Sequence, residues 1–97
     1  MMANKARGEA EVAGFILRPN FAALVAAEEE LGPLFALVER AAAGKLKLSE
    51  MVALFWHSLA DQSQVTRTDF ADAVINGGLA GATPALKNLL GQILGGR

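Results

Sequence analysis

The sequence contains no cysteine and no tyrosine, and only one histidine among its 97 residues. Without cysteine, disulfide bonds, thiol nucleophiles and cysteine-ligated zinc or iron–sulfur sites are excluded, which fits a reducing cytoplasm. One histidine and no tyrosine leave few groups for general acid–base chemistry. We therefore expect no enzymatic activity, no bound cofactor and no metal site.

The chain also lacks an excess of either charge, because nine Lys and Arg oppose ten Asp and Glu for a net charge of −1. Nucleic acid is not an expected partner, since backbone binding depends on a surplus of basic residues that release counterions. The longest uncharged run, Ala73 to Leu86, is too short and too interrupted by Gly and Pro to span a bilayer. Lys5 and Arg7 precede any apolar block without forming a signal peptide. We expect a cytoplasmic protein that does not bind membranes.

Small apolar residues make up much of what is present: 53% of the chain is hydrophobic, and nineteen residues are Ala. The length allows one domain, 1–97, and leaves no room for a second core. Because relatively few large side chains are available for burial, we expect modest stability and a fold that completes its burial on a partner.

The pattern of turn and cap residues predicts a mainly α (α+β) fold, a small bundle of about five short helices with a short N-terminal β-hairpin. Residues 1–7 are polar and are expected to be flexible. In residues 8–18, two short runs around Ala13-Gly14 indicate the hairpin.

The helices are expected within residues 20–94. Their boundaries are indicated by Asn20 and Gly32, Pro33 and Gly44, Ser49 as a third cap, Thr66-Arg67-Thr68-Asp69 as a capping box, Asn76-Gly77-Gly78 as a stop, and Thr83-Pro84 as a fifth start. The first helix places Phe21, Leu24, Val25 and Leu31 on a shared face. The last helix has the clearest amphipathic stripe, formed by Leu86, Leu89, Leu90, Ile93 and Leu94.

The polar residues give weak signals for chemistry. His57 has only Asp61 within one helical turn, and no nucleophile accompanies them, so a structural histidine is favoured over a catalytic one. Glu28-Glu29-Glu30 is interpreted as a solvated rim, because consecutive helical residues point in different directions and cannot converge on a metal. A DNA-reading helix-turn-helix is disfavoured because Asp69 and Asp72 outnumber Arg67.

Apolar side chains are the stronger candidates for function. The predicted helices carry more large apolar residues than five short helices can obviously bury, and such a surface could receive an apolar partner helix. The candidate partner-binding residues are Phe35, Phe55, Trp56, Leu86, Leu90 and Ile93.

Several short segments occur in an order and spacing that resembles one family along nearly the whole chain. They are Met2-Ala3-Asn4, Arg7-Gly8-Glu9, Leu17-Arg18-Pro19, Phe21-Ala22-Ala23-Leu24, Glu28, Glu30-Leu31-Gly32, Ala43-Gly44-Lys45-Leu46, Leu48-Ser49 and Gly78-Leu79. The chain resembles the gene transfer agent gp10-like, or phage tail assembly chaperone, family. It departs from the family pattern at Val12-Ala13-Gly14-Phe15, where the hairpin is shorter than usual.

This resemblance implies a non-enzymatic role in building a tail. Family members are described both as tube components and as chaperones that keep the tape-measure protein soluble and help tail-tube subunits assemble around it. The sequence favours the chaperone, because a tube subunit needs a sheet-rich scaffold and at most one hairpin is predicted here. A small cytoplasmic adaptor with an unrelated protein partner is the alternative, and the sequence leaves open whether the chain forms homo-oligomers.

Overall fold

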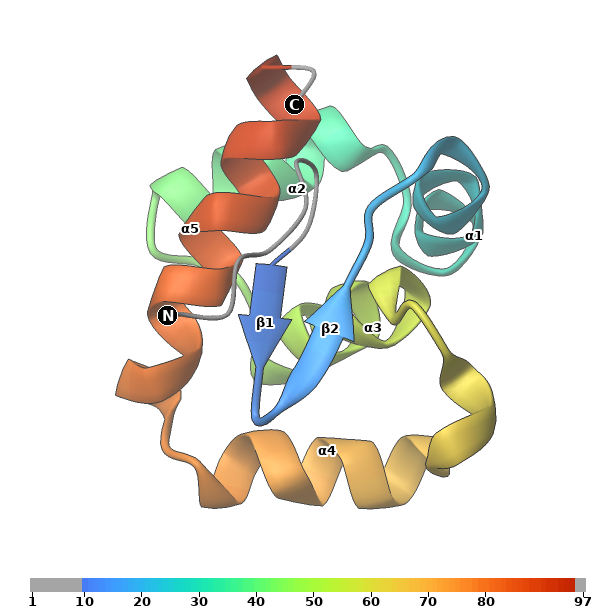
Figure 1. Cartoon of the computed structure of the whole chain (residues 1–97). Helices are drawn as coiled ribbons and strands as arrows, with labels where there is room; N and C mark the ends of the chain where they lie inside the picture. Colours follow the sequence, from blue (N-terminus) through green and yellow to red (C-terminus); the bar gives the residue numbers. More distant parts are fainter. Residues whose placement is uncertain (1–9, 96–97) are drawn as a thin grey trace.

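The computed structural model describes residues 10–95, so the expectations for residues 1–9 lie outside the described residues. In this part of the chain a β-hairpin is followed by five α-helices and one short 3-10 helix (Figure 1). The mainly α fold with an N-terminal hairpin is therefore confirmed. The elements are β1 (Ala10–Val12), β2 (Phe15–Leu17), α1 (Phe21–Leu31), α2 (Leu34–Ala42), α3 (Leu48–Ser58), η1 (Gln62–Gln64), α4 (Arg67–Asn76) and α5 (Leu79–Gly95).

The hairpin turns tightly at Ala13 and Gly14. Both residues have a positive φ, 52° and 84°, which is the backbone pattern of a two-residue type I′ turn and matches the right-handed twist of the strands. The antiparallel register pairs Ala10 with Leu17 and Val12 with Phe15. Side chains alternate along the strands, so Leu17 is buried while its neighbour Ile16 is exposed.

Backbone hydrogen bonds join β2 to the segment that follows α3. Arg18 N–H donates to the Ser58 carbonyl at 2.6 Å, and Ala60 N–H donates to the Ile16 carbonyl at 3.0 Å. Leu17 and Leu59 form an isolated antiparallel bridge between these two bonds. A short hairpin is only marginally stable alone, and this third segment together with the core holds it in place.

Ala13 is the weak point of the turn, because an alanine in the left-handed region carries a steric cost that asparagine largely avoids. We expect Ala13→Asn to raise the free energy of unfolding by about 0.5–1 kcal/mol, since Asn-Gly is the preferred type I′ pair. Urea unfolding followed by circular dichroism measures the change. Ala13→Val should act in the opposite direction, and equal stabilities for the two variants would contradict the proposed turn geometry.

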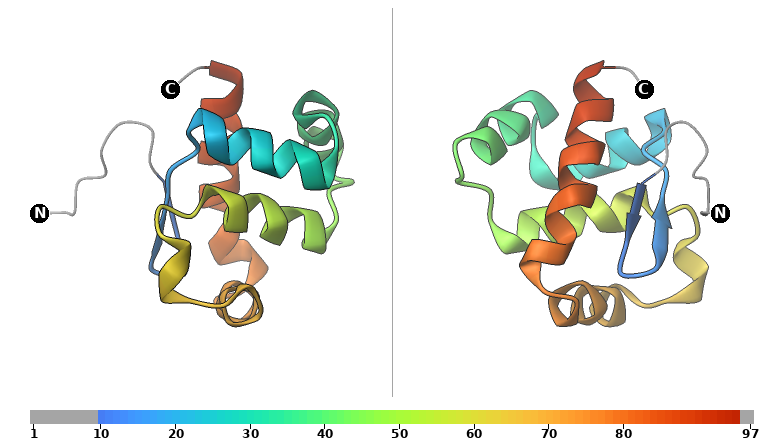
Figure 2. Two further views of the ribbon diagram at one scale, coloured as in Figure 1. Left: turned by 90° about the vertical axis from the view of Figure 1, so that its right-hand side faces the viewer. Right: turned by 60° about the vertical axis from the view of Figure 1, so that its left-hand side comes forward.

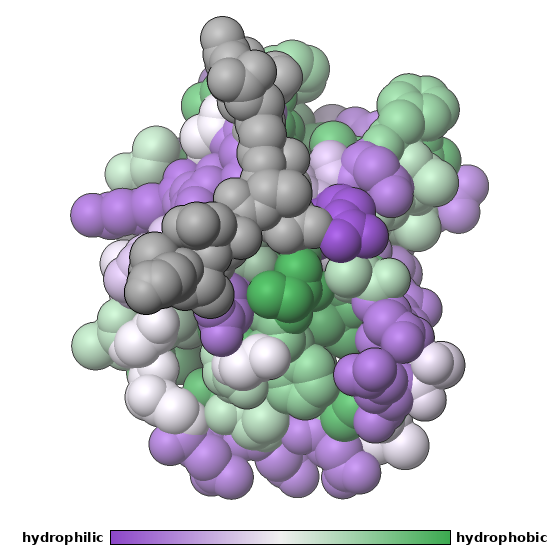
Figure 3. Space-filling model, viewed as in Figure 1, coloured by the Kyte–Doolittle hydropathy of each residue, from purple (hydrophilic) through white to green (hydrophobic). Residues whose placement is uncertain are grey.

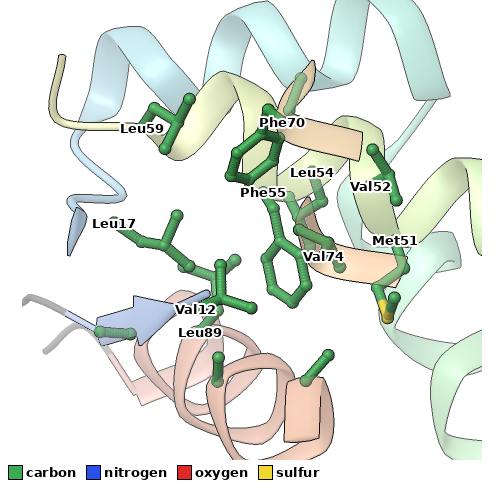
Figure 4. Close-up of a cluster of buried hydrophobic side chains, with 14 of the residues drawn as sticks. Val12, Leu17, Met51, Val52, Leu54, Phe55, Leu59, Phe70, Val74 and Leu89 are labelled. Atoms are coloured by element: carbon green, nitrogen blue, oxygen red, sulfur yellow. The ribbon is translucent and has the colours of Figure 1, made fainter. Parts of the chain in front are cut away.

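The core is built around α3. In the left view of Figure 2, α3 lies between α1 and α4, and Figure 1 shows the hairpin and α5 on its remaining sides. Five consecutive residues, Met51 to Phe55, are buried. Figure 4 shows the side chains of α3 converging with those of the hairpin, α4 and α5. Phe70 of α4 lies edge-on to Phe15, with ring centroids 5.2 Å apart.

Most predicted helix boundaries are confirmed, but the start of α3 is wrong. Asn20 accepts a hydrogen bond from Ala23 N–H at 2.9 Å, and Thr66 accepts one from Asp69 N–H at 3.1 Å, as their cap roles require. Ser49, however, lies inside α3, which is capped at Lys47. Glu50 takes over the capping, because its Oε1 accepts from Lys47 N–H at 2.9 Å.

The predicted start of the last helix at Thr83-Pro84 is also wrong. The helix α5 begins at Leu79 and contains Pro84 in its interior. Proline removes one helical hydrogen bond, but Ala82 and Ala85 on either side are buried against the core. Their packing holds the turn before Pro84 in helical form, and propensity alone could not have revealed it.

Candidate functional site

Two phenylalanines are far more exposed than core residues should be. Phe21 at the start of α1 is 84% exposed and Phe35 at the start of α2 is 75% exposed. They flank an open groove of about 200 Å³, which we call the aromatic groove. The groove is lined by Phe21, Leu24, Val25, Glu28, Leu34, Phe35 and Ile93. Figure 3 shows hydrophobic surface at the position where Figure 1 places α1.

The helices α1 and α2 pack into the core with the faces that lie opposite the groove. On α1, Ala27 is fully buried, and α1 packs against α3. On α2, Leu37 is fully buried and belongs to the core. The short connection between the helices is fixed by Glu28, whose Oε2 accepts a hydrogen bond from Leu34 N–H at 3.1 Å. Phe21 and Phe35 are therefore presented on a rigid frame.

The structure separates the six candidate partner-binding residues. Phe35 is exposed and Ile93 lines the same groove. Trp56, Leu86 and Leu90 are partly buried and pack against the core. Phe55 is 0% exposed, so the expectation that it lies on an accessible surface is wrong: it belongs to the buried run from Met51 to Phe55 in α3.

Sequence reasoning missed Phe21 as an exposed residue. It was placed on the shared face of the first helix with Leu24, Val25 and Leu31, yet Phe21 and Val25 are exposed while Leu24 and Leu31 pack against the core. No local signal distinguishes Phe21, since Leu34, which also directly follows a helix cap, is buried.

A second apolar hollow lies between α3 and α4. It has a volume of about 500 Å³ and includes the exposed side chains of Leu48 and Ile75. We call it the α3–α4 hollow. Its lining residues are Leu48, Ser49, Val52, Arg67, Thr68, Ala71, Asp72 and Ile75. These side chains are less exposed than Phe21 and Phe35, so the hollow is the weaker candidate for a binding surface.

An ion cluster centred on Glu30 joins three helices. The Glu30 carboxylate of α1 receives two hydrogen bonds from the Arg67 guanidinium of α4, at 2.9 and 2.5 Å. It also lies 2.7 Å from Nε2 of His57 on α3. Hydrogen bonds from Arg67, and then from His57, lower the pKa of Glu30 to about 2. Glu30 is exposed, as expected for a solvated rim, but it also links α1 to α3 and α4, which the expectation missed.

His57 consequently does not pair with Asp61. The Asp61 carboxylate instead accepts hydrogen bonds from the backbone N–H and the hydroxyl of Ser63 at the start of η1. His57 contacts a carboxylate, but the hydrogen bonds of the cluster include no nucleophilic side chain. They therefore do not form a catalytic unit. The arrangement is suited to holding helices together rather than to acid–base chemistry.

Removing the charge of Glu30 should weaken the fold. Because the side chain is about two-fifths exposed, solvent screens the cluster, and we expect Glu30→Gln to cost about 1 kcal/mol at pH 7. Its pKa is lowered from 4.5 to about 2 on folding, so this stabilisation is complete above about pH 4.5 and is lost as the pH falls toward 2.

Urea unfolding at pH 7 and pH 3 provides the measurement, with Glu29→Gln as the control that removes a neighbouring charge without touching the cluster. The difference in the free energy of unfolding between Glu30→Gln and the unmodified chain should be smaller at pH 3 than at pH 7. A difference that is unchanged or larger at pH 3 would contradict the assigned pKa.

A family model described as "Phage tail tube protein, GTA-gp10" matches residues 8–96. The chain belongs to this family. The resemblance carried by the short sequence segments is thereby confirmed, and the match includes both the hairpin and all five α-helices. No curated protein and no solved structure matches the chain.

For this member of the GTA-gp10 family, the described residues hold neither an obvious metal site nor a bilayer-spanning helix. Among residues 10–95, no group of three or more His, Asp or Glu side chains is placed to bind a metal ion. No helix in the same range is both long and apolar enough to cross a membrane. The aromatic groove is left as the most distinctive surface of this GTA-gp10 protein.

Proposed function

We propose that this protein is a non-enzymatic tail assembly chaperone that acts in the cytoplasm. The aromatic groove binds an apolar segment of the tape-measure protein, keeps that protein soluble, and presents it while tail-tube subunits assemble around it. The observation that carries the proposal is the exposure of Phe21 and Phe35 on a rigid frame, because large exposed aromatic side chains anchor protein partners.

The family description names a tube protein, but the fold favours a chaperone over a subunit of the tube wall. A wall built from pairing sheets needs long strands with free edges. Within residues 10–95 the only sheet has two strands of three residues each, and the β2 edge already pairs with Leu59. Helices with exposed apolar side chains are instead suited to receiving another helix.

Coexpression with the tape-measure protein tests this function. We expect the soluble fraction of the tape-measure protein to rise and a complex of the two chains to elute from size exclusion. A chaperone should also be missing from purified, finished tails, whereas a tube subunit would be present in many copies. Unchanged solubility together with no complex would contradict the proposal, and a complex with an unrelated cytoplasmic protein would favour the adaptor.

A further inference from the structure

The structure accounts for two of the three consecutive glutamates at the end of α1. Glu28 caps α2 through Leu34 N–H, and Glu30 joins Arg67 and His57. Glu29 is exposed, and its side chain makes no hydrogen bond or ion pair within residues 10–95. A negative charge there is unfavourable, because the helix dipole places partial negative charge at the C-terminal end. Glu29 therefore does not serve the stability of the helix that carries it.

Glu39 on α2 is in the same situation. It is exposed, and no side-chain partner for it occurs in the described part of the chain. The adjacent Arg40 does not neutralise it, because Arg40 pairs with Glu50 of α3. The helix α1 contains no basic residue at all. The helices α1 and α2, which present Phe21 and Phe35, thus carry negative charge that no residue among 10–95 compensates.

These two carboxylates lie in line with the groove. Residues four apart share one face of a helix, which places Glu29 one turn beyond Val25, and Val25 one turn beyond Phe21. By the same spacing, Glu39 lies one turn beyond Phe35 on α2. On each helix, an exposed apolar side chain of the groove is followed by an exposed carboxylate that has no partner among the described residues.

From this placement we infer that the aromatic groove selects an amphipathic helix whose apolar face is flanked by Lys or Arg. The inference rests on the proposed function and adds the chemistry of the bound segment. Apolar residues of the partner, spaced at i, i+3 or i+4 and i+7, lie between Phe21 and Phe35. Its basic flanks lie against Glu29 and Glu39, which steer the segment and fix its register.

Two designed peptides of about 18 residues test this selectivity. Both carry the same stripe of Leu and Phe at helical spacing, one has Lys at the flanking positions, and the other has Glu there. Fluorescence anisotropy with the full chain should give at least tenfold tighter binding of the Lys peptide in low salt, with the difference shrinking at high salt. Equal binding of both peptides would overturn the inference.

Variants of the chain that lack these charges provide a second test of the selectivity. We expect Glu29→Gln and Glu39→Gln together to weaken binding of the Lys peptide by about two- to tenfold, as exposed charge pairs allow. Their thermal stability should be unchanged or slightly higher, since neither carboxylate has a partner in the described fold and both lie toward the C-terminal ends of their helices. Asp72→Asn, which removes an exposed charge beside the α3–α4 hollow, should leave binding unchanged.

The outcomes separate this inference from the proposed function. If the unmodified chain solubilises the tape-measure protein but binds both peptides equally, or if the glutamine variants keep the full preference for the Lys peptide, the charge selectivity is wrong and the chaperone role stands. If the Lys peptide binds but the tape-measure protein stays insoluble, the selectivity stands and the chaperone role is wrong. If the chain elutes as a dimer and binds neither peptide, a second copy occupies the groove and the inference is overturned.

Discussion

Replacing Phe55 with alanine should destabilise the fold by about 3–5 kcal/mol, the range for a fully buried phenylalanine whose removal leaves a cavity. Small domains have total stabilities of about 5–15 kcal/mol, so much of the variant should be unfolded near physiological temperature. Urea unfolding followed by circular dichroism, or the midpoint of thermal unfolding, measures the effect. The predicted effect is large because Phe55 is fully buried in the core that is built around α3.

Phe35→Ala is the matched control, because it removes the same atoms from a side chain that is 75% exposed. Its effect on the free energy of unfolding should stay within about 0.5 kcal/mol. If Phe55→Ala proved as mild as Phe35→Ala, the packing around α3 would be wrong. Phe55 would then return to the candidate partner-binding residues.

Local signals in the sequence predicted most of the fold. Asn20 and Thr66 cap helices, and Gly32 ends one, through hydrogen bonds to residues only a few positions away. These roles could therefore be inferred without knowing any tertiary contact. The hairpin turn at Ala13-Gly14 is equally local. The exceptions are positions where tertiary packing overrides local preference. Burial of Ala82 and Ala85 lets α5 begin at Leu79, before Pro84, although proline disfavours a helix interior.

The candidate site was harder to predict, because exposure depends on contacts between distant segments. Phe35 and Phe55 are the same residue type on neighbouring helices, and only the arrangement of the other layers makes one exposed and the other buried. Glu30 shows the same limit, since its partners lie 27 and 37 residues away along the chain. No helical spacing could have related Glu30 to His57 and Arg67.

The aromatic groove combines rigidity with exposure, which is the condition for strong anchoring. The tie between Glu30 and its two partners fixes α1 against α3 and α4, and Glu28 fixes the start of α2. The backbone that carries Phe21 and Phe35 therefore does not have to fold when a partner binds, which limits the entropic cost of association to ordering the exposed side chains. The core and the ion cluster thus support the surface that we propose for binding.

Replacing both groove phenylalanines with serine should abolish the effect on the tape-measure protein. Buried aromatic anchors contribute about 2 kcal/mol or more each to binding, so Phe21→Ser and Phe35→Ser together should weaken the complex by at least about a hundredfold. The fold should survive, because both side chains are exposed and serine and phenylalanine have similar helix propensities. The soluble fraction of coexpressed tape-measure protein and the amount of complex on size exclusion are the readouts.

The matched control is Leu48→Ser with Ile75→Ser, which removes the exposed apolar side chains of the α3–α4 hollow and leaves the aromatic groove intact. It should solubilise the tape-measure protein as well as the unmodified chain does. If the hollow variant lost the complex while the groove variant kept it, the binding surface would be assigned to the wrong side of the molecule. Loss in both variants, with circular dichroism showing folded chains, would mean that the tape-measure protein contacts both faces, because the groove alone could not then account for binding.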